Sequence, residues 1–379
     1  MSYLDYQVAQ TPSGWRKIFY LSWPLVFLLA AVAAIGFLML YSVAGGRIET
    51  WAQPQMYRFA VGMVAMIGLA FVPMWFWRGI AVFAYVACLL LLVAVELVGD
   101  VGMGAQRWID LGPIKIQPSE LMKIALVLLL AAYYEWLDVK RVSRLQWVLV
   151  PVLLILTPTA LVLTQPDLGT SLMLVAGGGI VMFAAGVSLW YFGAVIAMVA
   201  GLVYAVMASR GTDWQLLKDY QFRRIDTFLD PSVDPLGAGY NITQAQIALG
   251  SGGWSGRGFM QGTQSRLNFL PEKQTDFIFT VLAEEFGFVG AMSLLTLYTL
   301  IIGFCLYSAI SNRDRFGSLL TIGISGTFFV YFAINMGMVM GMLPVVGSPL
   351  PLVSYGGTAM MILLMGFGMV QSAHVHRPR

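Results

Sequence analysis

Charge is scarce in this sequence. Only 11% of its 379 residues are charged, which is under half of the roughly 25% that is usual for soluble domains. Hydrophobic residues make up 59%, and apolar stretches of roughly 17 to 25 residues, long enough to cross a bilayer, recur along the whole chain. A soluble catalytic domain therefore has no stretch in which to fold, and the function must be built from helix ends and loops.

Cysteine and a strong net charge are lacking too. Cys88 and Cys305 lie inside apolar segments without a C-x-x-C motif or matching histidines, so packing roles are favoured over a disulfide or a zinc site. The formal net charge is only +3, and the basic residues are spread along loops instead of forming a patch with interleaved aromatics. We therefore expect no nucleic-acid partner.

Motifs for nucleotide phosphates are missing as well. The sequence has no G-x-x-x-x-G-K-[ST] motif, and its glycine cluster at 250–258 does not match G-x-G-x-x-G. We interpret this cluster as a tight turn at the membrane surface, with direct phosphate cradling as the alternative. No repeat of fixed period is visible, so a transporter built from detectable repeats is not favoured.

The apolar runs predict an all-α integral membrane protein, a single domain over residues 1–379 with about ten transmembrane helices. The first run lacks a small-residue cleavage site, which predicts an uncleaved span and not a signal peptide. A long loop at 210–276 separates the seventh span from the eighth. The spans are placed near 19–44, 56–77, 79–99, 119–137, 147–164, 171–187, 189–209, 277–310, 317–342 and 352–372.

Loop arginines and lysines set the expected orientation, because they are retained preferentially on the cytoplasmic side. With the N-terminus inside, the cytoplasmic segments receive most of these residues. They would hold Arg16, Lys17, Arg78, Lys140, Arg141, Arg144, Arg313, Arg315, Arg377 and Arg379. Both termini are therefore predicted to be cytoplasmic and the 210–276 loop external, where the absence of ATP would require an already activated substrate for any synthesis.

Polar residues gather where an outer loop leads into the fourth span. Ser119 could cap this helix, and Glu120 suits its positive end. Lys123 lies one turn further on, and a lysine facing lipid would cost roughly 2.5 to 3.5 kcal/mol at the helix centre. We expect Lys123 to face the bundle interior, where an ion pair with Glu120 and a cationic site for a substrate phosphate are equally suitable roles.

Two further loops carry candidate binding residues. Asp167, in a short loop before the sixth span, could simply cap that helix, or its carboxylate could position a cation or a sugar hydroxyl beside Arg107 and Lys123. Arg223 and Arg224 fall in a stretch that mixes aromatic, aliphatic and basic residues, which is typical of an interfacial helix in contact with membrane lipids.

The last candidates flank the eighth and tenth spans. Asp276 could be only the N-cap of the eighth span. In a cationic setting at the outer surface, however, it has what a general base needs when a sugar hydroxyl attacks an anomeric carbon and a diphosphate leaves. Ser348 and Ser354 lie in a Pro/Gly-rich outer turn at 343–358. Broken helix at membrane depth is tolerated only where it is buried or lines a cavity, so this turn marks a site or its wall.

Together these motifs carry a family resemblance. GAQRWIDLG, QPSELMK, QPDLGT, LPEKQTDFIF and LPVVGSPLPLVSYGG occur in this order, and the chain resembles the SEDS family of shape, elongation, division and sporulation proteins over essentially all its spans. Within that family it is more similar to RodA than to FtsW. The resemblance implies a peptidoglycan glycosyltransferase that polymerises lipid II, the undecaprenyl-diphosphate-linked substrate, outside the bacterial cytoplasmic membrane during elongation of rod-shaped cells.

The resemblance also implies site residues and a partner. Asp276 matches the family's essential carboxylate, proposed to deprotonate the acceptor GlcNAc 4-hydroxyl, and a class B penicillin-binding protein would crosslink the product. The expected substrate-binding residues are Arg107, Glu120, Lys123, Asp167, Arg223, Arg224, Ser348 and Ser354.

Three questions stay open at this stage. A divalent cation, Mg²⁺ or Mn²⁺, would neutralise a leaving diphosphate, but arginine and lysine could do so alone, and no ligand cluster decides between them. A lipid II flippase is the alternative from another functional class, because it would also need a cationic cavity and broken helices. A non-catalytic scaffold for the penicillin-binding protein is the third interpretation.

Overall fold

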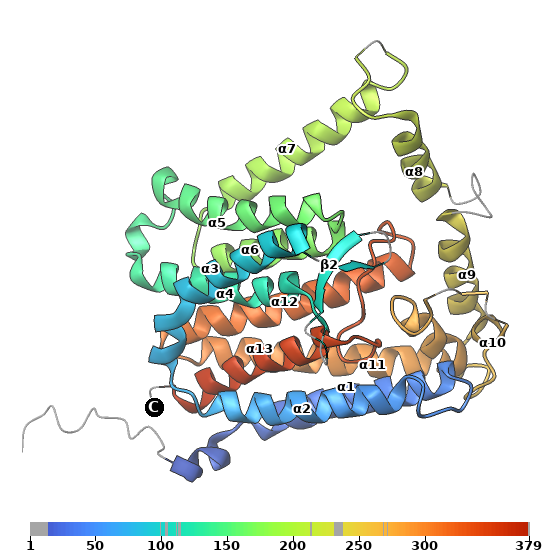
Figure 1. Ribbon diagram of the computed structural model, residues 1–379, viewed down its shortest axis with the longest axis horizontal. Coiled ribbons are helices and arrows are strands. Elements are labelled where there is room, and N and C mark those ends of the chain that lie inside the picture. Colours follow the sequence, from blue (N-terminus) through green and yellow to red (C-terminus); the bar gives the residue numbers. More distant parts are fainter. Residues whose placement is uncertain are drawn as a thin grey trace, which may run out of the picture.

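The computed structural model describes residues 14–377, except 99, 103–104, 111, 113–114, 213, 231–237, 268 and 271. The described chain is nearly all helical, and long helices lie side by side in a bundle (Figure 1). A short 3-10 helix, η1 (Gly14–Tyr20), precedes the bundle, and another, η2 (Val139–Arg141), joins two of its helices.

Ten bundle helices correspond one by one to the predicted spans. They are α1 (Trp23–Val43), α2 (Ala52–Ala70), α3 (Met74–Val98), α4 (Pro118–Trp136), α5 (Leu145–Thr164), α6 (Leu168–Ala184), α7 (Leu189–Ala208), α11 (Ile278–Ile310), α12 (Arg315–Val339) and α13 (Thr358–Val375). Among the described residues, seven helices are long and apolar enough to cross a membrane; α2, α4 and α6 are not in that set. The membrane bundle is therefore confirmed, while the count of ten spans stays a prediction.

Two predicted boundaries were clearly wrong: the end of the second span, and the start of the tenth, which was expected at 352 although α13 begins at Thr358. The second span was expected to reach residue 77, but α2 ends at Ala70 and α3 already begins at Met74. Pro73 lies between them, and proline both lacks a backbone N–H and disfavours helical backbone at the preceding residue. A proline inside a continuous apolar run therefore divides this run into two helices earlier than its hydropathy indicates.

A small antiparallel sheet was missed by the all-helical prediction. Its strands are β1 (Asp100–Gly102), β2 (Ala105–Asp110) and β3 (Lys115–Ile116), in the order β1-β2-β3. β1 and β3 are too short to show a pattern of alternating residues, and the six residues of β2, AQRWID, do not alternate strictly between apolar and polar. The sheet joins α3 to α4 at one end of the bundle, which we call the sheet end.

The long predicted loop contains helices of its own. These are α8 (Asp219–Leu229), α9 (Ala238–Ser251) and α10 (Thr263–Arg266), so the helical nature expected for the basic–aromatic stretch is confirmed. In Figure 1, α7 diverges from the other helices and leads to α8, and none of the residues of α7 is buried. By contrast, α9 packs against α11 and α12.

The longest helix, α11, is broken at Gly287, where φ is 65° and ψ is −158°. The glycine cluster fits into this break. The amides of Arg257 and Gly258 donate to the carbonyls of Glu284 and Glu285, each at 3.0 Å, and the carbonyl of Gly253 accepts from the amide of Phe288 at 2.9 Å. The cluster is thus a turn, as favoured above, and two amides that could have cradled a phosphate are bonded to α11.

This contact predicts a sharp difference between two glycines of one helix. A Cβ on Gly287 would collide with the backbone at Trp254–Gly256 and require an unfavourable positive φ, whereas a Cβ on Gly303 meets open space. Gly287→Ala should therefore lower the melting temperature of the purified protein in detergent, with strain costing about 1–3 kcal/mol or more. Gly303→Ala should leave it unchanged or slightly raised; equal melting temperatures for the two variants would contradict this account of the break.

Candidate active site

Asp276 lies in the turn that leads into α11, with its side chain half-buried. The prediction that it could be an N-cap is wrong, because the N-cap of α11 is Phe277. Among the described residues, no donor hydrogen-bonds to the Asp276 carboxylate. Burial, followed by the negative charge of Glu272, raises the pKa of Asp276 to about 6. This carboxylate is therefore available and is a stronger base than an ordinary aspartate.

The backbone around Asp276 is held by the Pro/Gly-rich turn at 343–358. The amide nitrogen of Asn335, on α12, donates to the carbonyls of Asp276 at 2.9 Å and Ser348 at 2.7 Å. The hydroxyl of Ser354 donates to the carbonyl of Thr275 at 2.5 Å. Two segments that the sequence analysis treated separately are thus one structure, which we call the loop clamp: residues 272–277 and 343–357 with Asn335 between them.

The two predicted serines differ within the loop clamp. The Ser354 hydroxyl is fully engaged, since it also accepts from the backbone amide of Leu350 at 2.8 Å. The Ser348 hydroxyl is buried and has no hydrogen-bond partner among the described residues. The structure therefore gives Ser354 a role in holding the loop, while Ser348 keeps a free hydrogen-bonding group.

Lys123 faces the interior of the bundle, as predicted, and its side chain is buried. Its ammonium lies 2.6 Å from Glu120 Oε1 and also contacts the hydroxyl of Tyr331, which donates to Glu120 Oε2 at 2.5 Å. All three side chains line a cavity whose remaining wall is mostly apolar. The expected ion pair is confirmed, and it leaves the lysine's charge neutralised.

Arg107 is positioned by β2 over the loop that joins α5 to α6. Its guanidinium donates to the carbonyl of Gln165 at 3.0 Å and lies 3.9 Å from Asp167 Oδ2; it also bonds to the carbonyl of Pro166. Asp167 caps α6 by accepting from the amide of Thr170 at 3.1 Å. The capping role and the proximity to Arg107 are both confirmed, and this arginine too is already paired with an acid.

The capping role suggested for Ser119 was wrong, because α4 has Gln117 as its N-cap and Pro118 in its first turn. Sequence reasoning also missed Tyr331 and Asn335, which are central to the geometry. The available signal was their polarity within the predicted 317–342 span, because polar side chains inside a membrane helix usually face the bundle interior and serve a function.

The remaining predicted residues are only partly described. Arg223 and Arg224 lie on α8, and their side chains fall outside the described residues. Within the part of the chain that the structure describes, no group of three or more His, Cys, Asp or Glu side chains is placed to hold a metal ion. A divalent cation, Mg²⁺ or Mn²⁺, stays a prediction.

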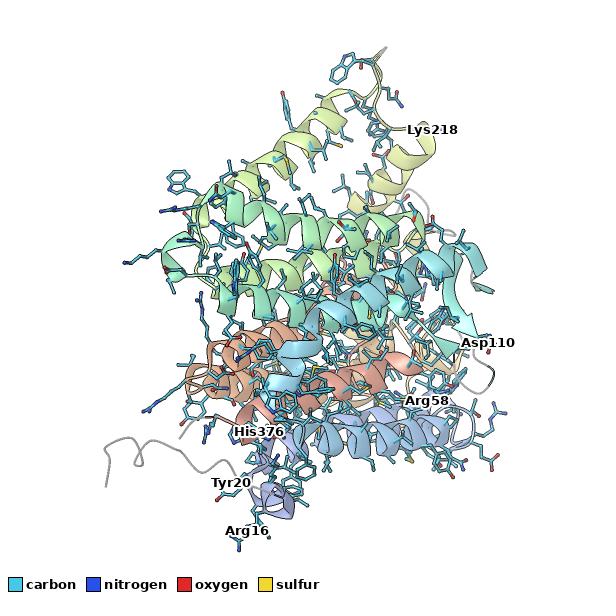
Figure 2. All side chains as sticks on the ribbon, turned by 60° about the vertical axis from the view of Figure 1, so that its left-hand side comes forward. Arg16, Tyr20, Arg58, Asp110, Lys218 and His376 are labelled. Atoms are coloured by element: carbon cyan, nitrogen blue, oxygen red, sulfur yellow. The ribbon has the colours of Figure 1, made fainter. Side chains whose placement is uncertain are left out.

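Figure 2 shows Arg58 and Asp110 toward one end of the bundle, while Arg16, Tyr20 and His376 lie toward the other. Apolar helices of membrane length, with a polar site between broken segments at the sheet end, define a polytopic membrane protein.

The family model for the cell cycle proteins FtsW, RodA and SpoVE matches residues 22–379. The chain belongs to this family, as the resemblance indicated.

Individual relatives are similar over nearly their whole length. The peptidoglycan glycosyltransferase MrdB of Escherichia coli (strain K12) is 43% identical, with 96% of this chain and 95% of the relative covered. The stage V sporulation protein E of Bacillus subtilis (strain 168) is 33% identical, with 91% and 94% covered.

Solved structures agree with the fold. One chain from a study titled "Structural coordination of polymerization and crosslinking by a peptidoglycan synthase complex" is 34% identical, with a TM-score of 0.81 and 94% of this chain and 98% of that chain covered. The rod shape determining protein RodA of Thermus thermophilus is 30% identical, with a TM-score of 0.70 and coverage of 95% and 98%.

The buried ion pair makes a testable prediction. Lys123→Met leaves the Glu120 carboxylate buried without its cation, and breaking such a pair on one side costs about 3–5 kcal/mol. We expect this single variant to melt well below the wild type. Adding Glu120→Gln should restore much of the loss, which a double-mutant cycle on melting temperatures in detergent will measure. Additive effects would show that the two side chains are not coupled.

Proposed function

We propose that this chain polymerises lipid II into glycan strands at the external face of the cytoplasmic membrane, for cell elongation. It is a peptidoglycan glycosyltransferase, in keeping with its family and with the named activity of its E. coli relative. The observation that carries the proposed mechanism is Asp276, an unpartnered carboxylate held by its backbone in the loop clamp, with its pKa raised to about 6.

In the proposed reaction, the GlcNAc 4-hydroxyl of one lipid-linked substrate attacks the anomeric carbon of the sugar at the diphosphate end of the other. The new C–O bond forms as the bond from that carbon to the diphosphate breaks. Asp276 takes the hydroxyl proton, and the diphosphate leaves with the electron pair of the broken bond. An ionised carboxylate also favours the positive character that develops at the anomeric carbon.

Basic side chains form the proposed cationic side of the site. Lys123, which lines the cavity, and Arg107 are proposed to bind phosphate oxygens. In the structure these two cations are paired with Glu120 and Asp167, respectively. Ser348 would offer its free hydroxyl. Arg223 and Arg224 stay proposed lipid-diphosphate contacts on the strength of their basic charge alone.

Replacing the base tests this function. Asp276→Asn keeps the size of the side chain but cannot accept the proton, and general-base catalysis typically contributes about 10²–10⁴-fold. Purified Asp276→Asn protein in detergent should lose glycan synthesis from lipid II by at least about 10²-fold, with a near-normal melting temperature, because its carboxylate has no hydrogen bond to lose. Unchanged synthesis would exclude Asp276 as the base. A flippase or a scaffold would give no glycan even from the wild type.

The raised pKa also predicts how the rate depends on pH. The base works only when ionised, so kcat/KM should fall as pH falls through about 6 and level off above it. Glu272 raises this pKa through its negative charge, so Glu272→Gln should move the acidic limb to lower pH. The matched variant Glu49→Gln, an exposed acid in the turn before α2, should leave the limb in place. A limb that ignores Glu272→Gln would belong to another group.

The proposed partner is a class B penicillin-binding protein that crosslinks the new strands. Support comes from the similar chain of a peptidoglycan synthase complex that coordinates polymerization and crosslinking. When both full-length membrane proteins are present, purification of one should recover the other, and failure to recover it would contradict the association.

The proposed orientation puts both termini in the cytoplasm and the 210–276 segment outside. Thr212 is exposed on this segment. A cysteine at Thr212 should react with a membrane-impermeant maleimide in intact cells. One at Ser311, exposed between α11 and α12, should react only after permeabilisation. Background is low because Cys88 and Cys305 are buried, and the reverse pattern would invert the topology.

A further inference from the structure

The site as described has a shortage of positive charge. Lys123 is neutralised by Glu120 and Arg107 by Asp167, yet the reaction proposed above brings two lipid diphosphates together. Each diphosphate is an anion that must be held near the surface. A basic side chain without an acidic partner, close to the loop clamp, would supply what these two pairs do not.

Arg58, on α2, is such a residue. It is half-buried, and among the described residues it forms no ion pair and its Nη1 is enclosed without a hydrogen-bond partner. Its guanidinium carbon lies 5.0 Å from the centre of the Tyr355 ring. A guanidinium enclosed on one side without an acid is costly unless an anion compensates it, and stacking on an aromatic ring replaces only part of that interaction.

Arg58 is tied to the loop clamp through its neighbours. The amide of Tyr355 donates to the carbonyl of Gln274, two residues before Asp276, at 2.8 Å. On the same face of α2, one turn earlier, Gln55 donates to the carbonyl of Ser354 at 3.0 Å. The Arg58 charge is therefore fixed beside the segment that carries the base, not free on the surface.

The depth of Arg58 suits a lipid phosphate. It lies six residues after the start of α2 at Ala52, which is about 9 Å along the helix axis at about 1.5 Å per residue. Helix side chains lean toward the N-terminus of their helix, here the sheet end (Figure 2). A long side chain this close to the helix start reaches back toward the sheet end, and its planar fork matches two phosphate oxygens at once.

We propose that Arg58 binds the diphosphate of one of the two membrane-embedded lipid substrates, at a site on the α2 side of the loop clamp that is separate from the Lys123 cavity. The site is formed by the Arg58 guanidinium, oriented by the Tyr355 ring and the Gln55–Ser354 contact. This inference rests on the proposed function for the identity of the lipid, and the ordinary phospholipid phosphate is the competing source of the same chemistry.

Binding of undecaprenyl diphosphate to the full-length protein in phosphatidylcholine nanodiscs tests the site without requiring turnover. Loss of one charge-assisted contact should weaken binding by about tenfold in Arg58→Gln, while Arg58→Lys, which keeps the charge but not the fork, should fall between Gln and wild type. Arg47→Gln is the matched control, because Arg47 is an exposed arginine just before α2 and outside the proposed site. It should bind like the wild type.

The outcomes separate the alternatives. Wild-type affinity in a folded Arg58→Gln protein, judged by its melting temperature, overturns the proposal. A second result also overturns it. If phosphatidylglycerol replaces phosphatidylcholine and the affinity of the wild type for undecaprenyl diphosphate drops to that of Arg58→Gln, then Arg58 holds ordinary phospholipid. If Arg58→Gln protein is unfolded, the comparison of Arg58→Lys with Arg47→Gln decides. A wild type that binds the probe but makes no glycan refutes the polymerase function alone.

Discussion

Backbone groups inside a membrane protein have no water to bond with, and this constraint shapes each break in the bundle. The break in α11 at Gly287 is closed by the glycine cluster. The loop between α5 and α6 receives donors from the Arg107 guanidinium. The Pro/Gly-rich turn is closed by Asn335, Gln55 and Ser354. Non-helical segments can therefore lie within the bundle, and polar side chains are drawn to them.

Charged side chains of the site follow a similar rule, because most of them have a partner of opposite charge. The two exceptions are side chains to which the proposals assign a role. Glu120 neutralises Lys123, and Asp167 lies beside Arg107, so these side chains are satisfied before any substrate arrives. Asp276 and Arg58 are not satisfied within the described residues. A carboxylate with a raised pKa and a guanidinium without an acid are unfavourable for stability alone, and the proposed reaction would supply a proton to the first and a phosphate to the second.

Hydropathy predicted the helical bundle and the family motifs predicted the candidate residues, because both depend on local sequence. Which loops meet could not be predicted: residues 272–277 contact 343–357 through direct hydrogen bonds and through Asn335, the one side-chain amide of α12. The N-cap prediction for Asp276 failed because an aspartate just before a helix is compatible with both a cap and a functional site, and the sequence alone does not separate the two. Short strands such as β3, with only two residues, have no periodic pattern to detect.

The double hydrogen bond of Asn335 has a mechanical consequence. The side-chain amide nitrogen of Asn335 bonds to the backbone of Asp276 and to the backbone of Ser348 at the same time, so both segments are tied to α12 at one point. A displacement of Asn335 would therefore act on both segments together. A shift of α12 at this point, caused by the bilayer or by another protein, would thereby reach the position of the Asp276 carboxylate.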